Sequence, residues 1–156
     1  MRTFVDTNVL VYAHDVDAGE KRDLASSRLR QLWADRDGVL STQVLQEFYV
    51  NVTRKIRTPV SRQDARDLLK AYAVWPLVVT DAADIQTAVG IEEQHRLGFW
   101  DALIVAAALK ANAEVLLSED LHATAKLRGI RVENPFTWTG ASEQKHAPDA
   151  GKPGQD

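Results

Sequence analysis

Short apolar runs alternate along the chain with stretches in which apolar residues recur every three or four positions. The short runs predict strands at residues 2–6, 38–41, 77–80, 115–118 and 130–133. The other stretches predict helices at residues 20–35, 43–56, 82–96 and 100–111, with two more beginning near Asn8 and after Ser61. Strands separated by helices indicate an α/β fold with a central parallel sheet flanked by helices on both faces.

The last sixteen residues differ in composition from the rest of the chain. From residue 141 the sequence reads ASEQKHAPDAGKPGQD, which is rich in Gly and Pro and lacks large apolar side chains. We therefore expect one folded domain at residues 1–140 and a disordered polar tail at residues 141–156.

The composition is that of an ordinary globular protein, with 45% apolar and 26% charged residues and no cysteine. Thiolate metal sites and disulfides are excluded, and a reducing compartment fits best. No apolar run is long enough to span a bilayer, and the first strand begins too early to leave room for a signal peptide. We expect a cytoplasmic protein with no membrane association. The net charge of −3 argues against tight non-specific nucleic-acid binding, but not against an enzyme that binds it through a local patch.

Acidic residues follow the first and fourth predicted strands. Asp6 ends the first strand, and Glu119 and Asp120 follow residues 115–118. The carboxyl ends of parallel strands meet at one edge of a sheet, where α/β proteins form their sites. If these two strands are neighbours, their carboxylates face one crevice.

Two further acids stand in unusual positions. Glu47 lies at the margin of the apolar face of the helix predicted at residues 43–56. Asp101 lies in the first turn of a helix that is apolar on nearly every side, within FWDALIVAAAL. Each acid alone has an ordinary explanation: Asp6 as a helix cap, Asp101 as a helix-start acid and Glu47 as a solvated residue.

Several carboxylates in one crevice repel one another unless one is protonated or a cation binds. Ligands that are all oxygen favour Mg²⁺ or Mn²⁺ over Zn²⁺. Such an ion can activate water for attack on a phosphodiester. A basic segment close to Glu47 is either a solvated helical face or a patch that follows phosphates; it contains Arg54, Lys55, Arg57, Arg62, Arg66 and Lys70. The four tryptophans are most simply residues of core or edge packing: Trp33, Trp75, Trp100 and Trp138.

Three segments together resemble the PIN-domain ribonucleases, and most closely the VapC-like toxins of prokaryotic toxin–antitoxin pairs. They are FVDTNVLVYA, STQVLQEFYVNVTRK and FWDALIVAAALKANAEVLLSEDL, and the resemblance covers about residues 1–136. It implies a PIN-like three-layer α/β/α fold and a metal-dependent endoribonuclease site with four acids.

The resemblance assigns roles residue by residue. The four acids match Asp6, Glu47, Asp101 and Asp120, where Asp120 is preferred to Glu119 because the last family acid follows a Thr-or-Ser-x-Asp pattern. Asp6, Asp101 and Asp120 would bind Mg²⁺ or Mn²⁺, and Glu47 would bind a second ion or orient the attacking water. Supporting residues match Thr7, Asn8 and Ser118. The expected partners are an RNA substrate, a cognate antitoxin protein and a second copy in a homodimer.

Two other functions stay open at the level of sequence. One is a PIN-fold protein that is not a toxin, either an RNA-binding protein or a housekeeping nuclease. The other is an acid-cluster phosphotransfer enzyme. A haloacid-type phosphatase would have Asp-x-Asp after the first strand, where this chain has Asp6-Thr7-Asn8.

Overall fold

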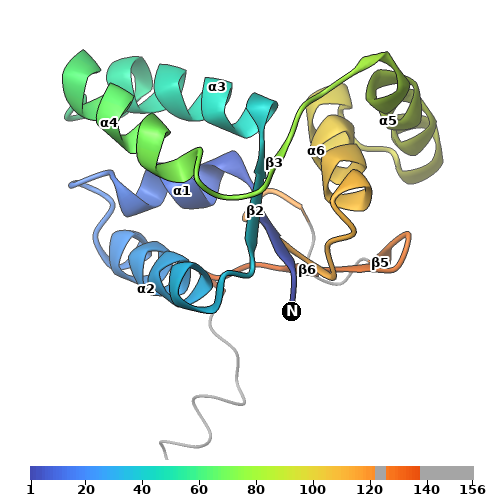
Figure 1. The fold of residues 1–156 in the computed structure, drawn as a ribbon, viewed down its shortest axis with the longest axis horizontal. Coiled ribbons are helices and arrows are strands. Elements are labelled where there is room, and N and C mark those ends of the chain that lie inside the picture. Colours follow the sequence, from blue (N-terminus) through green and yellow to red (C-terminus); the bar gives the residue numbers. More distant parts are fainter. Residues whose placement is uncertain (122–125, 138–156) are drawn as a thin grey trace, which may run out of the picture.

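The computed structural model describes residues 1–121 and 126–137 (Figure 1). Within them, six strands form one sheet: β1 (Thr3–Val5), β2 (Gly38–Ser41), β3 (Leu77–Val78), β4 (Val115–Leu117), β5 (Lys126–Leu127) and β6 (Ile130–Glu133). The α-helices there are α1 (Thr7–Ala13), α2 (Glu20–Asp35), α3 (Thr42–Val50), α4 (Arg62–Tyr72), α5 (Ala82–His95) and α6 (Phe99–Lys110). A π-helical turn, η1 (Asn51–Lys55), continues α3. The tail predicted at residues 141–156 lies outside the described residues.

The strand order in the sheet is β3-β2-β1-β4-β6-β5, and all neighbouring strands are parallel except β5 and β6. From β1 the chain moves outward to β2 and β3, then crosses back to β4 on the other side of β1. Right-handed crossovers therefore place α1 to α4 on one face and α5 and α6 on the other, as Figure 1 shows. The predicted three-layer fold is confirmed, and the strand order reverses between β1 and β4.

The core lies on both faces of the sheet, and its largest fully buried side chains include Phe4, Leu40, Phe48, Ile104 and Leu116. Every residue of α6 from Ala102 to Ala108 is buried, which explains why its sequence is apolar on all sides. In the described part of the chain, no helix is both long enough and apolar enough to cross a membrane.

Local chemistry determines where the helices begin. The Ser61 hydroxyl accepts a hydrogen bond from the Asp64 amide at 3.1 Å and caps α4. Asp81 and Asp84 form a reciprocal capping box at the start of α5. The structure differs from the predicted elements in three places. The helix predicted at residues 43–56 is α-helical only to Val50 and continues as the π-helical turn η1. β3 is shorter than the run at residues 77–80, and the two-residue strand β5, which is too short to carry a periodic pattern, was not predicted.

Gly38 begins β2 against the buried indole of Trp75. A Cβ atom at residue 38 would lie 2.3 Å from Cζ3 of Trp75 and 2.5 Å from its Cε3. Neither a rigid buried ring nor a paired strand can shift freely. Gly38→Ala should therefore lower the free energy of unfolding, measured by urea denaturation, by about 1–3 kcal/mol. Gly90→Ala in α5 is the control: the nearest atom to its new Cβ is 4.0 Å away, so stability should hold or rise by up to ~1 kcal/mol. Unchanged stability of Gly38→Ala would contradict this packing.

Candidate active site

Asp6 lies directly after β1, where the strand order reverses, and it is the N-cap of α1. Its Oδ1 accepts a hydrogen bond from the Thr7 amide at 2.7 Å, and its Oδ2 accepts one from the Ser118 hydroxyl at 2.7 Å. The side chain is buried, with only 4% of the residue exposed. The cap predicted for this residue and its position in the crevice therefore occur together.

The environment of Asp6 disfavours its charge. Its pKa is raised from 3.8 to about 7: burial is the main cause and the carboxylates of Asp101 and Asp120 add to it, while the hydrogen bonds from Ser118 and Thr7 lower the pKa. Burying an ionised carboxylate lowers the stability of the folded protein, and carboxyl groups with raised pKa values concentrate at functional sites.

Asp120 reaches the same crevice from the loop after β4, which pairs with β1. Its Oδ2 accepts a hydrogen bond from Asn8 Nδ2 at 3.0 Å, and its amide donates to Ser118 Oγ at 3.2 Å. Asn8 Oδ1 also accepts from the Glu119 amide at 3.2 Å. The first and fourth predicted strands are neighbours, which was the condition for a shared crevice, and Asn8 and Ser118 connect the loops that follow them.

Glu119 points to a different set of partners. Its carboxylate accepts a hydrogen bond from the Tyr12 hydroxyl at 2.7 Å and forms an ion pair with Lys21. Burial alone would raise its pKa, but the contacts with Lys21 and Tyr12 outweigh it and hold the pKa below its usual value. The structure therefore distinguishes the two adjacent acids: Glu119 is neutralised by a cation, whereas Asp120 faces the cavity.

Glu47 extends from α3 and is held at both carboxylate oxygens. Thr7 Oγ1 donates to Oε1 at 2.6 Å, and Gln43 Nε2 donates to Oε2 at 3.2 Å. The same Gln43 nitrogen donates to the backbone carbonyl of Trp100 at 3.2 Å, so it links α3 to the first turn of α6. Gln43 was not identified from the sequence, because a glutamine in the first turn of a helix carries no signal that separates it from a surface residue.

Asp101 lies in the first turn of α6. Its pKa is raised by partial burial and then by the negative charges of Asp120 and Glu47. Trp100, the preceding residue, is 64% exposed. Of the tryptophans predicted as core or edge packing, Trp75 is buried and Trp33 packs edge to face against it, whereas Trp100 contacts Phe99 but is mostly exposed at the cavity. Trp138 lies outside the described residues.

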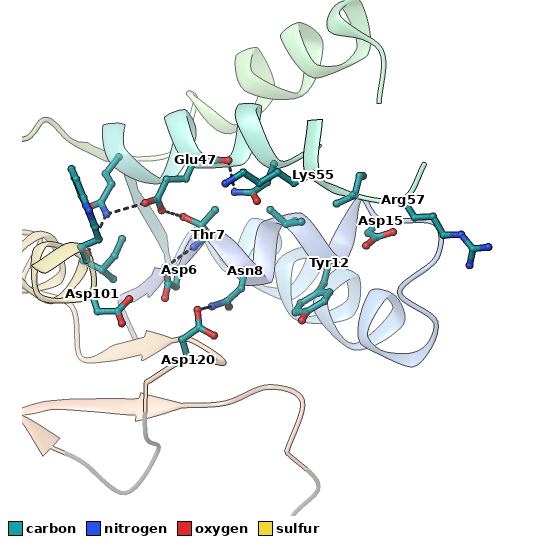
Figure 2. Close-up of a pocket in the computed structure, with 16 residues that line it drawn as sticks. Asp6, Thr7, Asn8, Tyr12, Asp15, Glu47, Lys55, Arg57, Asp101 and Asp120 are labelled. Carbon is teal, nitrogen blue, oxygen red and sulfur yellow. Dashed lines mark hydrogen bonds between the residues drawn. The ribbon is translucent and has the colours of Figure 1, made fainter. Parts of the chain in front are cut away.

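The four acids line one cavity of about 510 Å³ at the carboxyl ends of the central strands. Figure 2 shows Asp6, Glu47, Asp101 and Asp120 grouped together, with Lys55 and Arg57 farther along the cavity to the right. Only part of the predicted basic patch is therefore near the acids. Arg66 and Lys70 line a separate groove between α3 and α4.

The chemistry of these donors suits a hard divalent cation. Asp6, Glu47, Asp101 and Asp120 offer carboxylate oxygens only, and none of them takes part in an ion pair formed within residues 1–121 and 126–137. Over the same residues, no three His, Asp or Glu side chains are close enough to form a ready-made metal site.

Comparison with protein families gives one match. The sequence model of the PIN domain matches residues 3–129, which include all four cavity acids. No curated protein sequence matches the chain.

Several solved structures share the fold. A toxin–antitoxin complex from Klebsiella pneumoniae is 19% identical, with a TM-score of 0.64 over 86% of this chain and 98% of the other. VapBC2 from Rickettsia felis, bound to a DNA fragment from its promoter, is 20% identical, with a TM-score of 0.61 over 86% and 98%. VapC20 from Mycobacterium tuberculosis, described as a sarcin–ricin loop cleaving toxin, is 18% identical, with a TM-score of 0.56 over 73% and 86%.

Proposed function

The chain belongs to the PIN domain family, and on that premise we propose that it is a metal-dependent endoribonuclease acting as the toxin of a toxin–antitoxin pair. One observation carries the proposal: carboxylates from four separate segments of the chain line one cavity at the reversal of strand order. PIN-domain proteins of the VapC type are nucleases, so hydrolysis is the class of reaction that fits this site.

In this proposal Asp6, Asp101 and Asp120 bind Mg²⁺ or Mn²⁺, and Glu47 binds a second ion or orients the attacking water. The bound cation would activate water and neutralise charge on the phosphoryl oxygens. Thr7 and Gln43 fix the Glu47 carboxylate at both oxygens, so it is oriented before substrate arrives.

The proposed reaction is hydrolysis of an RNA phosphodiester. The water oxygen forms a bond to phosphorus and gives up a proton to the Glu47 carboxylate. The bond from phosphorus to the leaving ribose oxygen breaks, and that oxygen takes up a proton from solvent water. Ser118 and Asn8 keep Asp6 and Asp120 in position during this step through the hydrogen bonds that they donate.

The proposed substrate and partner are taken from the descriptions of the solved structures that share this fold. One of them is described as a toxin that cleaves the sarcin–ricin loop, and another as a toxin–antitoxin complex. We extend both features to this chain: RNA as substrate and a small antitoxin protein as partner, both in the cytoplasm. A homodimer stays a prediction.

Sequencing of RNA ends after controlled expression tests the proposed function. Expression of the wild-type chain in a bacterial host should create new RNA ends at a limited set of positions, and expression of Asp101→Asn at the same level should create none. Identical RNA ends for the two chains would contradict the proposal. A PIN-fold RNA-binding protein without hydrolytic activity would then be preferred.

Glu119→Gln and Asp120→Asn form a matched pair that tests which of two adjacent acids acts. Asp120→Asn should lower the RNA cleavage rate by about 100-fold or more, because it removes a proposed ligand. Glu119→Gln should leave the rate within about threefold of wild type, because Glu119 is bound to Tyr12 and Lys21 and is not one of the residues that line the cavity. Rates measured in excess Mg²⁺ on one RNA decide the question. The reverse order of effects would transfer the role to Glu119.

A further inference from the structure

Trp100 is exposed although tryptophan is strongly apolar. It lies in the first turn of α6, lines the acid cavity and is 64% exposed. Its ring contacts that of Phe99 edge to face, with 5.1 Å between centroids, and Gln43 Nε2 donates to its carbonyl at 3.2 Å. Phe99 and Gln43 therefore hold the residue in place, while much of the surface of its indole remains accessible to a ligand.

Two basic side chains line the same cavity, farther along it than the four acids. Lys55 is the last residue of η1 and Arg57 follows it by two positions, and both line the cavity. In the described part of the chain, neither forms an ion pair. Figure 2 places them on the side of the acids away from Asp101, the residue next to Trp100. The cavity therefore holds an aromatic residue, a group of carboxylates and a pair of cations.

We propose that Trp100 stacks on an unpaired base of the RNA next to the bond that is cut, while Lys55 and Arg57 bind a phosphate farther along the same strand. This inference rests on the proposed function and names its substrate subsite. The four carboxylates repel phosphate, so affinity for RNA has to come from groups around them. Base stacking on an aromatic side chain and cation–phosphate contacts supply it. A base in a duplex cannot stack in this way, so the subsite selects single-stranded or loop RNA.

The surroundings of Trp100 favour a nucleotide over a protein partner. Most of the residues that line the cavity with it are polar, among them Gln43, Glu47 and Asp101, although Ile104 also lines it. A protein-docking patch is a contiguous apolar surface. Exposed apolar side chains of that kind occur instead close to one another in sequence, along β3 and α5 and the residues beside them: Val74, Leu77, Val79, Ile85 and Val89.

A double-mutant cycle between protein and RNA tests the stacking. The RNA is a short single strand that the wild type cuts once, together with versions carrying a single abasic nucleotide at each position around the cut. Trp100→Ala should raise the RNA concentration for half-maximal single-turnover rate about 5- to 150-fold. Trp100→Phe should recover most of this loss, and Trp33→Phe, which changes an indole on α2, should cause none. One abasic position should cost the wild type a similar factor and cost Trp100→Ala nothing more.

Each outcome decides the inference. Unchanged RNA concentration dependence in Trp100→Ala, or an abasic penalty that simply adds to the mutational one at every position, overturns it. Loss of binding to a protein partner in Trp100→Ala, with RNA binding unchanged, overturns it in favour of a docking role. If the wild type cuts no RNA, fluorescence anisotropy of the same RNA in Mg²⁺ tests the subsite without cleavage. RNA binding that depends on Trp100 would support the subsite and contradict only the proposed hydrolysis. Absence of RNA binding would overturn the subsite.

Discussion

Asp6→Asn and Asp101→Asn should each reduce RNA cleavage by about 1,000-fold or more, equivalent to roughly 4 kcal/mol of transition-state stabilisation. Each substitution preserves side-chain volume and removes one negative ligand from the cavity. Asn is as good an N-cap as Asp, so α1 should still begin at residue 7 in Asp6→Asn. Single-turnover rates in excess Mg²⁺ measure the effect. Glu93→Gln, which removes an exposed carboxylate on α5, is the control and should cleave normally.

The stability of Asp6→Asn provides an independent readout of the same site. Burial raises the pKa of Asp6 from 3.8 to about 7, so the folded protein favours the neutral carboxyl. This favourable contribution is complete below about pH 4 and is lost as the pH rises through about 7. The advantage of Asp6→Asn over wild type should therefore grow by on the order of 4 kcal/mol between these limits.

Urea unfolding in EDTA at several pH values measures this difference. Any fixed cost of rebuilding the hydrogen bond from Ser118 does not vary with pH, so the change with pH isolates the charge. If Asp6→Asn and Asp101→Asn both cleave RNA at the wild-type rate, the site is assigned wrongly. A stability difference that does not vary with pH would show that Asp6 ionises freely in the fold.

Expression of the wild-type chain alone should arrest bacterial growth, and co-expression of its cognate partner should relieve the arrest. The cavity explains how a partner could inhibit: its four carboxylates form no ion pair within the described residues. An arginine from a partner would bind such carboxylates through paired hydrogen bonds and exclude the cation.

Colony counts after induction measure this prediction, with Asp101→Asn as the control that should allow normal growth. Harmless expression of a wild-type chain that cuts the RNA of the same host in vitro would contradict the toxin proposal. A housekeeping nuclease would then fit better.

Sequence patterns predicted the architecture wherever a local signal marks an element. The helix at residues 20–35 and the strand at residues 38–41 have the predicted bounds. The acids at the ends of parallel strands were predicted to share one crevice if their strands are neighbours, and the pairing of β1 with β4 meets that condition and brings Asp6 and Asp120 together. Strand β5 escaped prediction because its pairing with β6 is antiparallel and only two residues long.

Side-chain direction and exposure could not be predicted from the sequence in the same way. Glu119 and Asp120 are adjacent acids, and only the contacts of Lys21 and Tyr12 separate them. Trp100 has the large apolar side chain typical of a core residue, but it lies one residue before Asp101 and is exposed at the cavity. The π-helical turn after α3, which carries Lys55 to the cavity, arises in a segment whose pattern is that of a continuous helix.

Cleavage of a single-stranded RNA by the purified chain, with and without a divalent cation, tests the central claim most directly. After exhaustive dialysis against EDTA the wild type should be inactive, and addition of Mg²⁺ or Mn²⁺ should restore cleavage. Asp101→Asn, purified in the same way, should be inactive under both conditions, which excludes a contaminating nuclease. Undiminished cleavage by the wild type after chelation would contradict the account.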